Sequence, residues 1–204
     1  MARVVEAVRI LKQGATVAYP TESFFALGAD ATNARAVKKV FRLKGREGKP
    51  IALIAGSLAQ VEKFFAVSAA ERRLMKRFWP GALTIVLRPK KKIAARALFG
   101  LTTPSRPSSG HPSSTRRGQY RIGVRVPRHA QARALALGLG RPITATSANI
   151  SGKRPTKLRT VVERTFRGIV MVNGACGTAK KPSTILSMDN GKMNILRRGA
   201  VRVK

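Results

Sequence analysis

Three cations lie close together around two glycines in the segment Lys44-Gly45-Arg46-Glu47-Gly48-Lys49. Glycine gives the backbone freedom to turn, so Lys44, Arg46 and Lys49 can converge on one anion. Arginine offers a planar fork to phosphate oxygens and lysine a mobile point charge, and both neutralise charge that develops when pyrophosphate leaves. The segment therefore indicates a polyphosphate site. The alternative is a solvated helix end whose cations face the helix dipole.

A second set of polar side chains follows an apolar run that ends at Ala145. The segment Thr146-Ser147-Ala148-Asn149 stands where a strand would end, and carboxyl ends of strands are frequent ligand sites. The Ser147 hydroxyl and the Asn149 carboxamide can orient phosphate or sugar oxygens without adding charge. The same pattern is also found in turns and helix caps, so a nucleotide site and a local turn both stay open.

Other catalytic patterns do not appear in the sequence. It contains no Rossmann, Walker or kinase glycine motif, so a nucleotide site has to be built differently. Neither His111 nor His129 lies near an acidic pair or a serine or cysteine that would complete a hydrolase or metal site. Cys176 is the single cysteine, which excludes an intramolecular disulfide and fits a reducing compartment. We expect no metal-ligating residues.

The overall composition predicts one folded domain that attracts anions. The chain has 204 residues, of which 44% are hydrophobic and 24% charged, so one core is expected over residues 1–204. Its 41 Lys and Arg against 8 Asp and Glu give a formal net charge of +33, a field that favours nucleic acid, nucleotides or anionic membranes. Basic surfaces also serve solubility. Apolar runs are far shorter than a membrane span, and we expect a cytoplasmic protein.

Hydrophobic periodicity predicts helices and strands that alternate along the chain. Asn33 is a suitable N-cap and Gly45 a suitable stop for the helix between them. This alternation predicts an α/β fold with a mixed sheet. The expected helices cover 4–11, 34–44, 57–65, 68–78, 129–139 and 157–166, and the expected strands cover 15–19, 51–55, 82–87, 121–126, 142–146, 168–172, 183–186 and 193–197.

Residues 100–118 interrupt this rhythm. The segment is crowded with Ser, Thr, Pro and Arg and has no hydrophobic period. Such composition predicts a flexible insertion, either a lid or a tolerated loop.

Six short motifs occur in order and together resemble the YrdC/Sua5 family. The resemblance runs from about Val4 to Val201 apart from the insertion, and six ordered motifs are far more specific than any one of them. The motifs are Tyr19-Pro20-Thr21-Glu22-Ser23, Lys44-Gly45-Arg46, Trp79-Pro80-Gly81, Val124-Arg125-Val126-Pro127, Ser147-Ala148-Asn149 and Pro182-Ser183-Thr184-Ile185.

The resemblance implies a twisted mixed sheet with flanking helices around a large, positively charged cavity that holds ATP and L-threonine. It implies a threonine site at Thr21 and Arg125, where the guanidinium would pair with the substrate carboxylate, although strand alternation also permits Arg125 to face the surface. Lys44 and Arg46 are the implied catalytic cations, expected to face phosphates rather than the core. The implied ATP-binding residues are Lys44, Arg46, Lys49, Ser147, Asn149, Ser183 and Arg197.

The sequence departs from the family pattern at a few positions. Ser23 stands where many relatives have Thr, Phe25 where many have Tyr, Ala26 where many have Gly, and Glu47 where many have Pro. The loop that ends at Lys49 is also a residue shorter than in some relatives. None of these changes removes a required cation. Since the chain ends soon after the Arg197 region, it resembles the short, single-domain form.

The implied activity is synthesis of threonylcarbamoyl-adenylate from L-threonine, bicarbonate or carbon dioxide, and ATP with Mg²⁺, for modification of an adenosine in tRNA. A tRNA-modifying transferase would be the downstream partner, and weak RNA binding would follow from the charge. Two alternatives stay open. One is an RNA-binding or ribosome-associated protein that uses the same scaffold, although few aromatic residues are present for base stacking. The other is a carbamoyl-adenylate enzyme.

Overall fold

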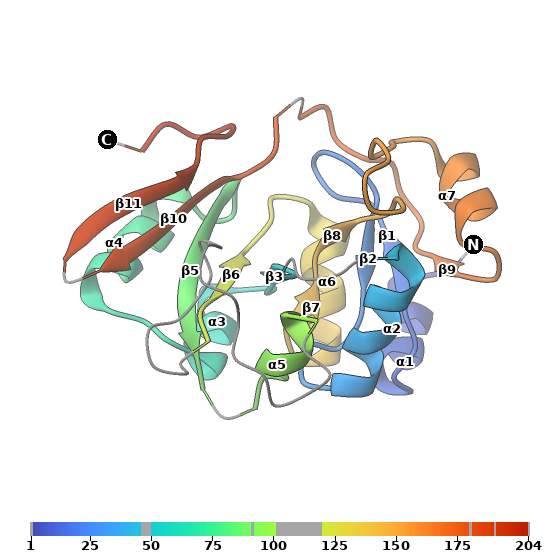
Figure 1. The fold of residues 1–204 in the computed structure, drawn as a ribbon, viewed down its shortest axis with the longest axis horizontal. Helices are drawn as coiled ribbons and strands as arrows, with labels where there is room; N and C mark the ends of the chain where they lie inside the picture. The colour runs from blue at the N-terminus through green and yellow to red at the C-terminus, as the bar shows by residue number, and fades with distance from the viewer. Residues whose placement is uncertain are drawn as a thin grey trace.

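Helices and strands alternate along the chain in two twisted sheets (Figure 1). This computed structural model describes residues 2–45, 50–90, 92–100, 120–179, 181–189 and 191–203. The helices are α1 Val4–Lys12, α2 Ala34–Lys44, α3 Leu58–Phe64, α4 Ala69–Phe78, α5 Ala95–Leu98, α6 Ala130–Leu139 and α7 Arg159–Thr165. The strands are β1 Val17–Tyr19, β2 Ala26–Gly28, β3 Leu53–Ile54, β4 Phe65–Ala66, β5 Leu83–Pro89, β6 Ile122–Arg125, β7 Ile143–Thr144, β8 Thr146–Ser147, β9 Val170–Met171, β10 Thr184–Asp189 and β11 Lys192–Arg197.

Both sheets mix parallel and antiparallel pairs. The smaller has four strands in the order β8-β2-β1-β9, and the larger has seven, in the order β11-β10-β5-β6-β3-β7 with β4 beside β5. Strand β6 lies antiparallel to β5 and parallel to β3, whereas β10 lies parallel to β5. The expected α/β fold with mixed strand pairing is confirmed, but the strands form two sheets instead of one.

A single extended segment joins the two sheets. The sequence predicts one strand over 142–146, whereas the structure has β7 in the larger sheet and β8 in the smaller. Between them, the backbone amide of Ala145 donates to the carbonyl of Ala52 at 2.8 Å. The chain therefore changes sheets at Ala145, and Ser147 emerges at the end of the smaller sheet.

Local capping fixes where the helices begin and end. The Asn33 side chain accepts hydrogen bonds from the first amides of α2, and Gly45 ends this helix in the left-handed conformation at φ 53°. Ser68 and Glu71 form a capping box at the start of α4. The ends of α2 and α4 agree with the sequence prediction. The location of the Lys44 side chain follows from the end of α2.

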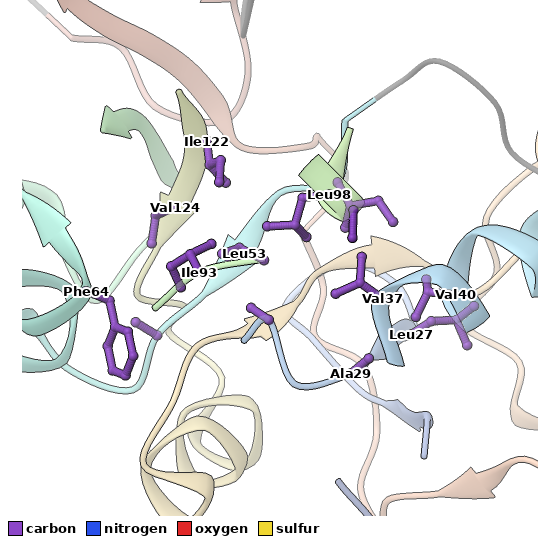
Figure 2. Close-up of a cluster of buried hydrophobic side chains, with 14 of the residues drawn as sticks. Leu27, Ala29, Val37, Val40, Leu53, Phe64, Ile93, Leu98, Ile122 and Val124 are labelled. Atoms are coloured by element: carbon purple, nitrogen blue, oxygen red, sulfur yellow. The ribbon is translucent and has the colours of Figure 1, made fainter. Parts of the chain in front are cut away.

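The main core lies between the sheets and the helices that cover them. Figure 2 shows Leu27 of β2 close to Val37 and Val40 of α2, and Leu53 and Val124 of the larger sheet beside Ile93. A second cluster joins α1 and α6 to the smaller sheet. Each fully buried aliphatic side chain contributes about 1.5 to 3 kcal/mol, so these clusters hold the strand ends in fixed positions.

The expected insertion at 100–118 lies outside the described residues except for Gly100. No helix within the described ranges is both long and apolar enough to cross a membrane.

Candidate functional site

Three of the expected site residues lie at the ends of neighbouring strands of the larger sheet, on the same side. Since β6 runs antiparallel to β5 and β10 runs parallel to β5, the end of β6 and the start of β10 lie at the same edge. Arg125 is the last residue of β6, and Ser183 directly precedes β10. Arg197 ends β11 and lies opposite Ile185 in the ladder. The topology thus brings Arg125, Ser183 and Arg197 to one rim of the larger sheet.

Arg197 is fixed on this rim by hydrogen bonds to Ser183. Its Nε donates to the Ser183 carbonyl at 3.1 Å, and Nη2 donates to that oxygen at 2.7 Å and to the Ser183 hydroxyl at 3.2 Å. The hydroxyl also lies 2.8 Å from that of buried Thr84. The guanidinium is held without an acidic partner among the described residues, so its charge is available to an anion.

Arg125 and Arg197 repel each other electrostatically. Partial burial, and secondly the nearby charge of Arg125, lower the pKa of Arg197. Because the two guanidinium groups repel each other, the rim carries a positive potential that attracts a carboxylate or a phosphate.

A buried ammonium joins the end of α2 to the end of β8. Lys44 is 1% exposed, and its Nζ donates to the carbonyls of Ser147 at 2.5 Å and Asn149 at 2.6 Å. The Ser151 amide in turn donates to the Lys44 carbonyl at 2.8 Å. A buried ammonium is tolerated only where acceptors surround it, and here those acceptors set the path of the 147–151 loop.

This position corrects the expectation that Lys44 faces away from the protein interior. The helix ends at Gly45 with the Lys44 side chain directed inward, where backbone carbonyls replace water. Lys44 thus has a structural role that the sequence pattern did not reveal. Arg46 and Lys49, the other two cations of the segment, lie outside the described residues.

The side chain of Asn149 keeps one hydrogen-bonding group that the loop does not use. The Asn149 amide nitrogen donates to the carbonyls of Ile150 and Lys153, at 2.8 and 2.7 Å. Its side-chain oxygen has no hydrogen-bond partner among the described residues, and a buried unpaired acceptor is costly unless a ligand supplies a donor. The backbone thus bends at Ala148 and Asn149, directly after β8, and the bend presents the unpaired oxygen of Asn149.

Thr21 shapes the turn that follows β1. It is 4% exposed; its hydroxyl donates to the Phe24 carbonyl at 2.7 Å and accepts from the amides of Ser23 and Phe24. These local bonds are typical of a side chain that stabilises its own turn. Thr21 thereby fixes the direction of its neighbour Glu22.

Glu22 forms an ion pair with Arg125 that the sequence analysis missed. The Arg125 Nη1 donates to Glu22 Oε1 at 3.3 Å, and Nη2 lies 3.3 Å from Oε2. The Arg128 amide also donates to Oε1, at 2.6 Å. The two side chains are 14% and 17% exposed, so Arg125 points into the rim and not to the free surface. The only sequence signal for this pair was that Glu22 stands beside Thr21 in one motif.

We expect Glu22→Gln to lower the free energy of unfolding by about 3 kcal/mol, because it leaves Arg125 without its partner in a poorly solvated place beside Arg197. Urea unfolding of the variant measures this loss. The matched control is Glu163→Gln, which removes the exposed pair with Arg159 and should cost at most about 0.5 kcal/mol. Equal losses of unfolding free energy in the two variants would contradict the conclusion that Glu22 and Arg125 form a buried, stabilising pair.

The segment from Asn173 to Ala179 packs against the Thr21 turn. The amide of Gly177 donates to the Thr21 carbonyl at 2.9 Å, and the Ala179 amide to the Glu22 carbonyl at 3.0 Å. A Cβ at Gly177 would lie 2.7 Å from the Glu22 carbonyl oxygen, so only glycine fits there. Within this segment, burial raises the pKa of the Cys176 thiol despite a hydrogen bond to the Thr21 backbone.

Two contacts connect the Thr21 turn with the Ser147 loop. The Ala148 amide donates to the Phe25 carbonyl at 2.7 Å, and Ala26 of β2 pairs with Ser147 of β8. The described site residues thus occupy neighbouring strand ends and loops. Among the described residues, no group of three or more His, Cys, Asp or Glu side chains could hold a metal ion. The arrangement suits an anionic ligand bound by fixed cations and neutral polar groups.

The chain belongs to the Sua5/YciO/YrdC family. The family model, which carries the description "Telomere recombination", matches residues 9–199. This agrees with the resemblance inferred from the six motifs.

Similar proteins include named threonylcarbamoyl-AMP synthases. The one from Thiobacillus denitrificans is 36% identical over 90% of this chain and 89% of its own length. The one from Bacillus subtilis is 34% identical over 98% of this chain, and the match covers 54% of that longer relative.

Solved structures show the same fold. Pyrococcus abyssi Sua5 complexed with L-threonine is 31% identical, with a TM-score of 0.81, over 96% of this chain and 54% of that one. E. coli YciO is 25% identical, with a TM-score of 0.78, over 98% and 91% of the two chains.

Proposed function

We propose that this protein forms threonylcarbamoyl-adenylate and pyrophosphate from L-threonine, bicarbonate or carbon dioxide, and ATP, for modification of tRNA. The observation that carries the proposal is the pair of guanidinium groups, Arg125 and Arg197, at one rim of the larger sheet. Family membership and the names of relatives over nearly the whole chain support it. An enzyme that joins an amino acid to an adenylate needs these two kinds of subsite side by side.

The proposed threonine subsite lies at Arg125 and Thr21. The Arg125 guanidinium would receive the substrate carboxylate, sharing its donors with Glu22, and Thr21 would fix the adjoining turn. L-threonine in the complex of the Pyrococcus relative supports an amino-acid subsite in this fold. Because a guanidinium has five donors, the ion pair with Glu22 leaves others for the substrate.

The proposed ATP subsite lies between the Ser147 loop and Arg197. Asn149 would accept a hydrogen bond from the nucleotide, and Ser183 and Arg197 would flank it. Lys44 would place its positive charge beneath the phosphates while holding the loop. In the proposal, Arg46 contacts the phosphates as the second catalytic cation and Lys49 adds a further one.

In the proposed reaction the threonine amine takes up carbon dioxide, and an oxygen of the resulting carbamate attacks the α-phosphorus of ATP. The bond from the α-phosphorus to the bridging oxygen breaks, and pyrophosphate leaves. Such in-line substitution depends on orientation and on fixed positive charge. No side-chain nucleophile is needed. Mg²⁺ would enter with ATP as part of the substrate, held by phosphate oxygens.

The direct test is release of pyrophosphate. We expect release from ATP only when both L-threonine and bicarbonate are present. Release that needs a carbamoyl donor such as carbamoyl phosphate, in place of threonine and bicarbonate, would favour a carbamoyl-adenylate enzyme. No release under any condition would contradict the proposal.

We expect adenylate synthesis to proceed at the same rate with and without RNA. The proposed chemistry uses small substrates only, and the positive charge predicts weak RNA binding with steep salt dependence and no sequence preference. Rates with unmodified tRNA, with an unrelated RNA of equal length and with no RNA test this independence. Synthesis that starts only with tRNA would favour the alternative in which RNA recognition is the primary function.

The remaining proposals concern the setting of the reaction. The product would pass to a tRNA-modifying transferase in the cytoplasm, and residues 1–204 would act as one domain. Copurification with such a transferase and cell fractionation would test these points.

A further inference from the structure

A cavity of about 490 Å³ lies outside the proposed active site, between α2 and the turn that follows α7. Its polar lining includes Lys39 and Arg42 of α2 and Arg167 after α7. None of the expected site residues that the structure describes lines it. Lys44 is on the same helix, but its side chain points inward, whereas Lys39 and Arg42 are exposed. The cavity therefore faces away from the Lys44 ammonium.

The three cations of this cavity have no acidic partner within the described residues. The described part of the chain places no acidic side chain in the lining of the cavity. Five of the eight acids of the chain form ion pairs elsewhere, and Glu71 caps α4. The one acid of α7, Glu163, is paired with Arg159 at 2.8 Å. None of these six acids pairs with the cations of the cavity, so the described residues give the cavity a positive lining that favours an anion.

The cationic lining continues along the outer face of α2. Arg35, Lys38, Lys39 and Arg42 are all exposed and recur three or four residues apart, so they lie on one face. The opposite face is buried, and the helix contains no acid. From Arg35 to Arg42 the helix rises by about 10 Å. This length exceeds one phosphate group and suits successive phosphates of a strand.

Apart from Thr16, whose buried hydroxyl has no hydrogen-bond partner among the described residues, the rest of the lining is apolar and offers no exposed aromatic ring. Leu43 and Ile169 are partly accessible, but Phe166 is 3% exposed. Base stacking needs an accessible ring, so a nucleic acid would be held here through its backbone. Arginine and lysine contacts to phosphate carry no sequence information.

We propose that the cavity lined by Lys39, Arg42 and Arg167, together with the cationic face of α2, binds the phosphate backbone of a single RNA strand without sequence preference. The site is separate from the proposed adenylate chemistry and does not depend on it. RNA bound here would lie on the outside of α2, near the end of the helix that reaches the proposed active site.

The test compares two triple variants that lose the same number of charges. The cavity variant is Lys39→Gln, Arg42→Gln and Arg167→Gln. The control is Arg73→Gln, Lys76→Gln and Lys192→Gln, which removes exposed cations of α4 and β11 at the opposite end of the molecule in Figure 1. Binding of a short fluorescein-labelled single-stranded RNA of mixed sequence is measured by anisotropy between about 50 and 200 mM salt.

We expect the cavity variant to lower the slope of log K against log salt by about 2, since three contacts contribute about 0.7 each. Affinity near physiological salt should fall roughly tenfold or more. The control variant should keep at least two thirds of the RNA affinity of the unmodified protein. Both variants should retain pyrophosphate release. Equal losses of RNA affinity in the two variants, or no loss in the cavity variant, would overturn the assignment of the RNA site to this cavity. Displacement of the RNA by AMP or inorganic phosphate at low millimolar concentration would instead show a small-anion site and overturn the assignment to RNA.

Discussion

Replacement of Lys44 by methionine is expected to lower the rate of adenylate formation roughly a hundredfold or more. Loss of one charged contact at a transition state costs about 2.7 to 4 kcal/mol. Here the loss has two sources. The ammonium adds positive charge beneath the proposed phosphate position, and it holds the carbonyls of Ser147 and Asn149. Methionine preserves much of the side-chain volume, so the charge and its hydrogen bonds are the main change.

The buried position of Lys44 also predicts a loss of stability in the Lys44→Met variant. Two backbone carbonyls lose their donor, and a buried unsatisfied acceptor costs about 1 to 3 kcal/mol. Lys38→Met is the matched control, because Lys38 is exposed on the same helix and lies outside the proposed active site. We expect it to retain wild-type turnover. Wild-type turnover in Lys44→Met itself would show that the nucleotide subsite lies elsewhere.

Replacement of Arg125 by lysine is expected to raise the KM for threonine by roughly tenfold to a hundredfold while the KM for ATP changes little. Lysine keeps a charge that can still pair with Glu22, but it loses the planar fork that binds two carboxylates at once. A hydrogen bond to a charged group contributes about 1.5 to 3 kcal/mol, which gives this range. Titration of each substrate at saturating levels of the other separates the two constants.

Arg121→Lys is the control for the Arg125 experiment. Arg121 directly precedes the same strand and is also ion-paired, with Asp189 at 2.7 Å, but it lies at the opposite end of β6. We expect it to leave both KM values unchanged. Equal rises in the two constants for Arg125→Lys would assign Arg125 to a shared role between the subsites.

Local sequence signals predicted the longer elements because those signals act within the element. The cap at Asn33 and the stop at Gly45 define α2 without reference to the rest of the chain. Strands β2 and β4 and helix α5 were not predicted. The segment Ala26–Gly28 has no β-branched residue, and its strand geometry comes from pairing with β1 and β8. The change of sheet at Ala145 is likewise a tertiary effect.

The residue types of the candidate site could be predicted from its motifs, but their contacts could not. The acceptors of the Lys44 ammonium are backbone carbonyls more than a hundred residues away, and backbone groups leave no trace in the sequence pattern. The pair of Glu22 with Arg125 joins residues 103 apart in the sequence. Both contacts depend on which strand ends lie side by side, and only the folded structure shows this arrangement.

The most direct test of the proposed activity is identification of the product by mass. The full chain is incubated with L-threonine, ATP and ¹³C-bicarbonate without RNA, and the mixture is separated by liquid chromatography with mass detection. We predict an adenylate that contains threonine and one labelled carbon, formed in equal amount to pyrophosphate. Pyrophosphate without a labelled adenylate, or a labelled adenylate that forms equally well without threonine, would contradict the proposed function.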